Sequence, residues 1–141
     1  MNPELDEVNE WLHKARIDLL SAQILMKHGV PVFDAAAFHC QQAVEKALKA
    51  FLVWKAVRFE KVHSLTYLLD LCEVEEPGFA SLRERAETLA PFAAEIRYPG
   101  EVVEVSREGA QEVFATAKAV WDFILHLLPG ELHPPLADNN E

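Results

Sequence analysis

Apolar residues recur every three or four positions along most of this 141-residue chain. That spacing places apolar side chains on one face of an α-helix. It predicts a first long helix over about residues 4–28, which Gly29 and Pro31 would end. A second long helix is expected over about residues 34–56, with Asp34 as its N-cap. Because the connection between them is short, the two helices should form an antiparallel hairpin.

Three further segments carry the same spacing. Two predict shorter helices, over about residues 64–74 and 77–93, and one predicts a last long helix over about residues 106–128. The serines placed to cap two of these helices are Ser64 and Ser106. No segment has the alternation that is typical of a strand. The predicted fold class is therefore all-α: an up-and-down helical bundle of three long and two shorter helices.

Length and charge limit what such a bundle can do. The chain is long enough for a single domain, expected over residues 1–128, and residues 129–141 are expected to form a disordered C-terminal tail. The 23 acidic and 13 basic residues give a net charge of −10, which argues against coating nucleic acid with the whole surface. The segment from Lys46 to His63 is an exception, with five basic residues and one acidic residue. An anionic ligand is expected at or beside this segment.

The second helix also carries a polar stripe with helical spacing, on the side away from its apolar face. Its members are His39, Gln42, Lys46 and Lys49. Such donors can hold an anion, but an ordinary solvated face gives the same pattern. The lysines could instead pair with Glu45 or Asp70.

The cysteines and the N-terminal residues indicate the compartment in which the protein is expected. Cys40 and Cys72 fall among apolar positions, so we expect two buried thiols rather than a disulfide or a metal pair. Residues 1–6 lack the basic and apolar regions of a signal peptide. No apolar run reaches the ~18 residues that a membrane span requires. We therefore expect a soluble protein in the reducing cytoplasm, with no membrane partner.

Four segments together resemble the HEPN family, the higher-eukaryote and prokaryote nucleotide-binding domain. They occur in the family's order within about residues 8–128. In chain order they are Trp11–Ala22, Ala36–Ala50, Lys61-Val62-His63-Ser64-Leu65, which is similar to the family's Lys-Thr-His-Asp-Leu, and Arg97-Tyr98-Pro99. The second segment is the most specific. The resemblance implies an up-and-down helical bundle that is commonly a homodimer.

The resemblance also implies two kinds of function. Members are often encoded beside a minimal nucleotidyltransferase, and some such pairs act as toxin and antitoxin. Many other members are metal-independent ribonucleases, with an arginine followed after four to six residues by a histidine. In that chemistry the histidine takes the 2′-hydroxyl proton and the arginine stabilises charge on the phosphate. Arg97 has no histidine at that spacing, whereas Arg58 and His63 do have it, but between the second and third predicted helices.

Our prediction is a nucleotide-binding or partner-binding subunit that acts with a small nucleotidyltransferase in a toxin–antitoxin-like module. The predicted nucleotide-binding residues are His39, Gln42, Lys46, Lys49, Arg97 and Tyr98. Arg97 would grip a phosphate with two N–H groups and Tyr98 would stack on a base, unless they only bridge and pack within the bundle. One alternative is a ribonuclease toxin that uses Arg58 and His63, or Arg97 with a histidine brought near by folding or dimerisation. The other is a non-enzymatic dimerisation module.

No metal or other cofactor is expected. Glu10 and His13, and likewise Glu60 and His63, have the Glu-x-x-His spacing of di-iron helix bundles. The first pair points away from the apolar face, and the second lies in a predicted loop. The further glutamates that would bridge two irons are missing from the core positions.

Overall fold

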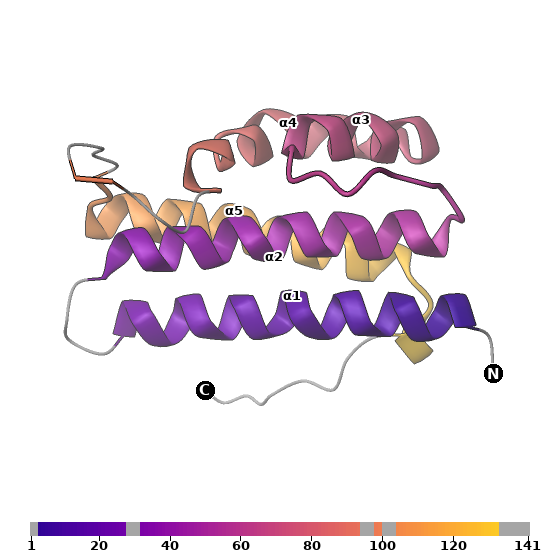
Figure 1. The fold of residues 1–141 in the computed structure, drawn as a ribbon, viewed down its shortest axis with the longest axis horizontal. Coiled ribbons are helices and arrows are strands. Elements are labelled where there is room, and N and C mark those ends of the chain that lie inside the picture. Colours follow the sequence, from indigo (N-terminus) through magenta and orange to yellow (C-terminus); the bar gives the residue numbers. More distant parts are fainter. Residues whose placement is uncertain (1–2, 28–31, 94–97, 100–103, 133–141) are drawn as a thin grey trace.

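The computed structural model describes residues 3–27, 32–93, 98–99 and 104–132. Three long helices lie side by side, and two shorter helices lie at the edge of the bundle away from the first long helix (Figure 1). The α-helices are α1 (Pro3–Lys27), α2 (Phe33–Trp54), α3 (Leu65–Glu75), α4 (Ala80–Glu87) and α5 (Arg107–Leu127). The described residues contain no strand. The predicted all-α bundle of three long and two shorter helices is confirmed.

The second long helix is the centre of the bundle. It packs against α1 along its length and also contacts α5 and α3. Thirteen of its 22 residues are buried, far more than a single apolar stripe would need. Many of the buried residues are alanines, whose small side chains allow the helices to approach closely. Because neighbours surround α2, its polar residues also meet other helices.

The helix starts are set partly by the predicted caps. Ser64 and Ser106 are the N-caps of α3 and α5, and their hydroxyls accept hydrogen bonds from Tyr67 N at 3.1 Å and Gly109 N at 2.9 Å. The prediction for Asp34 was wrong, because α2 begins at Phe33. Asp34 lies inside the first turn, where its charge favours the positive end of the helix dipole.

The predicted fourth helix is broken into three pieces. A 3₁₀-helix, η1 (Pro77–Phe79), precedes α4, and a second one, η2 (Ala90–Phe92), follows it. Pro91 explains the second break, since proline lacks the N–H that an α-helix interior requires. Pro77 begins η1, a position at which the missing N–H is tolerated. Phe79 fixes this region to the core by edge-on contacts with Phe51 and Phe123, at centroid distances of 5.1 and 4.9 Å.

Arg83 ties α3 to α4. Its guanidinium binds Asp70 and Glu73 on α3 and Glu87 on its own helix. The hydrogen bonds to Asp70 and Glu73 raise the pKa of Arg83 further above its usual value. Three carboxylates therefore converge on one cation at this joint.

The chain continues in contact with the core after α5. The 3₁₀-helix η3 (Gly130–Leu132) follows, and Leu132 is buried in the main apolar cluster. Residues 133–141 lie outside the described part of the chain, so the disorder expected of the tail stays a prediction. Within the described ranges, no helix combines the length and the apolar character needed to cross a membrane.

Both thiols are fully buried and free of disulfide bonds, as predicted. Burial, with a smaller contribution from the charge of Asp18, raises the pKa of Cys40 to about 12. Burial also raises the pKa of Cys72, whose thiol donates to Leu48 O at 3.8 Å. Since the thiolate is the reactive form, neither group should react at neutral pH.

We expect the folded protein to release almost no thionitrobenzoate from a disulfide reagent at pH 8, because both thiols stay protonated and covered. The same protein in denaturant should release two equivalents at once. Rapid reaction of the folded protein would contradict the burial of these residues.

Candidate functional site

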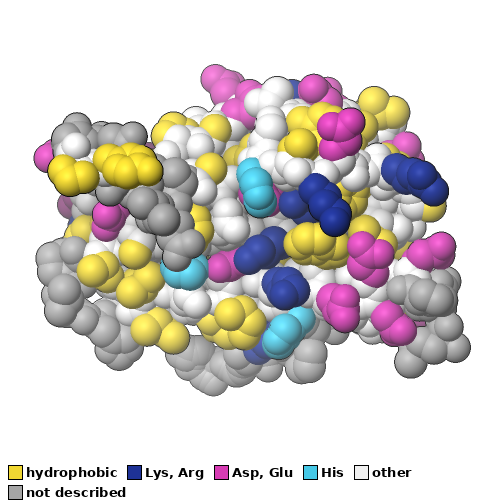
Figure 2. All heavy atoms as spheres, viewed as in Figure 1, with side chains coloured by type: hydrophobic (Ala, Val, Ile, Leu, Met, Phe, Trp, Pro, Cys, Tyr) yellow, Lys and Arg dark blue, Asp and Glu magenta, His cyan; other side chains and the backbone are white. Residues whose placement is uncertain are grey.

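Basic and imidazole side chains gather on one face of the bundle. Figure 2 shows them over the middle of the face formed by α1, α2 and the loop after α2. This is the region in which the sequence placed the locally positive segment. Two buried carboxylates, on Asp18 and Glu45, hold the cluster from beneath.

Asp18 anchors the first half of the cluster. It lies on α1 and is only 7% exposed. One carboxylate oxygen lies 2.8 Å from His39 Nδ1, and the other accepts from Lys46 Nζ at 2.6 Å. The side chains of His39 and Lys46 remain 31% and 24% exposed. One buried anion thus holds a lysine ammonium and an imidazole, both partly exposed, side by side.

Glu45 anchors the second half from α2 itself. It is 2% exposed, and its Oε2 accepts from Lys49 Nζ at 3.0 Å and lies 2.8 Å from His63 Nδ1. Its other oxygen accepts from the amide of Gln41 at 3.4 Å. Gln42 extends this chain of bonds by donating to Gln41 at 2.7 Å. A buried carboxylate needs such partners, since an unpaired one would be strongly destabilising.

Lys49 differs from the surface cation that the polar stripe suggested. Its side chain is only 7% exposed, and its ammonium lies 5.2 Å from the ring centroid of Trp11 and 6.0 Å from that of Phe59. Trp11 comes from α1 and Phe59 from the loop after α2, and these elements cover the stripe at this position. Lys49 therefore balances Glu45 inside the protein, as the pairing alternative proposed.

The two histidines share one arrangement. Each has Nδ1 against a carboxylate, which favours a proton on Nδ1 and turns Nε2 away from the carboxylate. In the neutral imidazole the bare Nε2 can accept a proton, and in the imidazolium it can donate to a phosphate oxygen. The charges of Asp18 and Glu45 are already balanced by two lysines, so each protonated imidazole adds net positive charge to the face.

Arg58 and His63 both lie in the loop between α2 and α3, where the sequence placed them. Arg58 is exposed, and His63 is 76% exposed although Glu45 holds its Nδ1. The loop begins at Ala56, whose φ of 58° is unusual for a residue other than glycine. Tyr67 fixes the middle of the loop, because its hydroxyl accepts from Glu60 N at 3.0 Å.

The remaining predicted pair is Arg97 and Tyr98. Arg97 lies outside the described residues, and Tyr98 is exposed. In Figure 1 the short segment of residues 98–99 lies at the end of the bundle where α2 and α5 begin. The basic and imidazole side chains seen in Figure 2 lie over the middle of the bundle instead. A joint site with Arg97 and Tyr98 stays a prediction.

Sequence reasoning missed Asp18 and Trp11. Asp18 follows Ile17 and precedes Leu19 at the edge of the apolar face of α1, which is the one available signal that its carboxylate is buried. The alternative to ligand binding paired Lys46 with Glu45 or Asp70, but Lys46 binds Asp18 instead, and Asp70 binds Arg83. The described residues contain no group of three or more His, Cys, Asp or Glu side chains that could hold a metal ion.

Comparison with known proteins places this fold in one family of helical domains. A model of the HEPN domain matches residues 8–127. The chain belongs to the HEPN domain family. No curated protein matches it.

Two solved structures share the fold. TT1696 from Thermus thermophilus is 27% identical, with a TM-score of 0.69 over 86% of this chain and 98% of that one. ST0689, described as an archaeal HEPN homologue, is 24% identical, with a TM-score of 0.68 over 85% of this chain and 96% of that one.

The burial of Glu45 gives a test of the cluster. Replacing it in Glu45→Leu should lower the free energy of unfolding by about 3–5 kcal/mol, because Lys49 would stay buried without its partner. The double variant Glu45→Leu/Lys49→Met should recover much of that loss, since no buried charge would remain unpaired. Urea denaturation gives the free energy of unfolding of the wild-type protein and of both variants.

The matched control is the exposed i,i+4 pair of Lys118 and Asp122 on α5. Asp122→Leu should change stability by less than about 1 kcal/mol, because exposed pairs contribute little. If Glu45→Leu lowered the free energy of unfolding as little as this control does, Glu45 would not be the buried anchor of the cluster.

Proposed function

We propose that this HEPN domain is a subunit that binds the phosphate groups of a nucleotide on the face formed by α1, α2 and the loop after α2. The observation that carries the proposal is the pairing of His39 and Lys46 on one buried carboxylate. Fixed in this way, the two groups lose little further side-chain freedom when they meet an anion.

The chemistry of the neighbouring residues supports a phosphate as the ligand. Lys46 supplies a point charge, and the Nε2 atoms of His39 and His63 supply donors when the rings are protonated. Arg58 and Lys61 are exposed on the adjacent loop and add positive charge. Because Asp18 and Glu45 offset two of the positive charges, binding should be modest rather than tight.

The same proposal includes protein partners. Ile17 and Ile24 are seven residues apart on α1 and are 46% and 57% exposed, so they form part of one exposed apolar face. We propose this face of α1 for contact with a second copy or with a small nucleotidyltransferase, as in a toxin–antitoxin-like module. Ile17 is next to Asp18, so such a contact would lie beside the nucleotide site.

Titration calorimetry with ATP, ADP and AMP tests the nucleotide site. We expect dissociation constants between about 10 μM and 1 mM for the wild-type protein. Lys46→Ala and His39→Asn should each weaken binding about tenfold by removing a donor and its charge. Arg97→Ala tests whether the arginine predicted for this site contributes.

The control for this titration is Lys118→Ala, which removes a lysine that pairs with Asp122 on α5. It should bind nucleotides as the wild-type protein does. Equal heats from wild type, Lys46→Ala and His39→Asn, with all three folded by circular dichroism, would refute the site.

A second candidate is metal-independent cleavage of RNA, favoured by the geometry of His63. Glu45 holds Nδ1 of this exposed imidazole at 2.8 Å, an arrangement that suits a general base. Arg58 lies in the same loop and would stabilise charge on the scissile phosphate. His63 would take the proton of the attacking 2′-hydroxyl, and the 5′-oxygen would leave as a hydroxyl with a proton from water, which yields a 2′,3′-cyclic phosphate.

If the protein is such a ribonuclease, it will cleave single-stranded RNA in the presence of EDTA and leave 2′-deoxy substrates intact. His63→Ala and Arg58→Ala should each lower the rate at least about 100-fold, as expected for loss of a general base or of charge stabilisation. Lys61→Ala, a neighbouring loop cation, should retain activity. An intact substrate after long incubation with the wild-type protein would exclude this candidate.

A further inference from the structure

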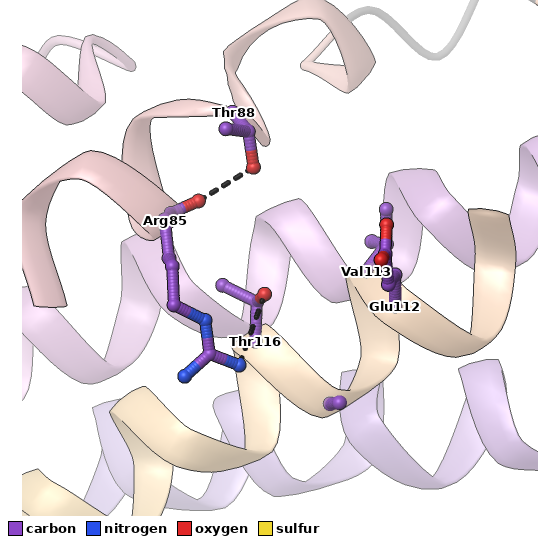
Figure 3. Close-up of a pocket in the computed structure, with 6 residues that line it drawn as sticks. Arg85, Thr88, Glu112, Val113 and Thr116 are labelled. Carbon is purple, nitrogen blue, oxygen red and sulfur yellow. Dashed lines mark hydrogen bonds between the residues drawn. The ribbon is translucent and has the colours of Figure 1, made fainter.

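A cavity with charged residues in its lining lies between α4 and α5, away from the α1 face. It has a volume of about 320 Å³, within the usual range for small-ligand sites. The described residues that line it are Arg85, Thr88, Glu112, Val113, Ala115 and Thr116. Figure 3 shows Arg85 and Thr116 at one side of the cavity and Glu112 with Val113 at the other.

Hydrogen-bond donors lie at the side of the cavity that Arg85 and Thr116 form. Arg85 Nη2 donates to Thr116 Oγ1 at 3.4 Å, a long and therefore weak bond. Among the described residues, no other side-chain bond of Arg85 exists, so most of its N–H groups can meet a ligand. Thr116 is only 8% exposed, and its own hydroxyl proton has no acceptor among the described residues. A buried hydroxyl whose proton lacks an acceptor favours a ligand that accepts a hydrogen bond from it.

Two acceptors lie at separate places on the lining: Thr88 just after α4, near Arg85, and Glu112 across the cavity on α5 (Figure 3). The Thr88 hydroxyl donates to the backbone carbonyl of Arg85, so its oxygen keeps lone pairs for a donor. Glu112 is exposed, and within the described part of the chain its carboxylate has no ion-pair partner. Val113, beside Glu112, and Ala115 add a short apolar wall to the lining.

We propose that this cavity binds a small zwitterion that carries one carboxylate and one ammonium group, as a free α-amino acid does. The carboxylate would accept from Arg85 and Thr116, and the ammonium would donate to Glu112 and Thr88. The apolar wall would contact a short aliphatic side chain. A simple anion would meet repulsion from Glu112, and a simple cation would meet repulsion from Arg85, so the two charges together select for a ligand with both.

The alternative is that Arg85 and Glu112 pair directly in solution and leave no role for a ligand. The structure holds the guanidinium against Thr116 instead, and across the described ranges no N–O contact within ion-pair distance joins Arg85 to Glu112. A direct pair would also leave the buried hydroxyl of Thr116 without the arginine. Binding of a zwitterion to the cavity separates a ligand site from a direct pair of Arg85 and Glu112.

The test is a titration of the isotope-labelled wild-type protein with L-valine, followed by amide chemical shifts. We expect saturable shifts at residues 85–88 and 112–116, with a dissociation constant at or below about 10 mM. Two probes each lack one charge: isovalerate has no ammonium, and isobutylamine has no carboxylate. Each should bind at least about tenfold more weakly, which is the loss of about 1.4 kcal/mol of binding.

Arg85→Gln and Glu112→Gln should each abolish saturation by L-valine, while Lys118→Gln, on the same helix outside the cavity, should leave it unchanged. No saturable shift with the wild-type protein, or equal binding of isovalerate and L-valine, would overturn the proposal. Retained binding in a folded Glu112→Gln would also overturn it. The inference does not depend on nucleotide binding, because none of these residues belongs to the α1 face.

Discussion

Two carboxylates buried between helices constrain this protein more than any other feature. Asp18 and Glu45 would be strongly destabilising if left unpaired, so the fold must bring cations to both of them. Asp18 requires α1 to face α2 at one register, because His39 and Lys46 must reach its two oxygens together. Glu45 requires the loop after α2 to fold back over the helix and deliver His63. Apolar packing alone would tolerate small shifts of α1 along α2, whereas these charged contacts specify one alignment.

The sequence predicted the helices well because each helix is determined by local spacing. The apolar faces of the long helices, the capping serines and the buried cysteines all follow from residues a few positions apart. The breaks around α4 were harder to place, because Pro77 and Pro91 are compatible with helix ends as well as with interruptions. The error at Asp34 is of the same kind, since an aspartate one residue inside a helix start resembles a cap.

The charged cluster could be predicted only in part, for a physical reason. A single-helix pattern identified His39, Lys46 and Lys49 as one stripe, but it could not show which neighbour would cover that stripe. The partners of His39 and Lys46 come from α1, 21 and 28 positions earlier in the chain. Lys49 looked like a surface residue because its burial depends on two aromatic rings from other elements. Membership of the HEPN family accounts for the shared bundle, while the chemistry of the face rests on these long-range contacts.

The position of Trp11 has an optical consequence. An indole ring is a natural fluorophore whose emission colour responds to the electric field of nearby charges, and the Lys49 ammonium lies 5.2 Å from its centroid. Trp54 has Lys55 at a similar distance, but that lysine is exposed to solvent, which screens its field. The emission of Trp11 should therefore respond to rearrangement around Glu45, over a background from Trp54 and Trp121, without any added label.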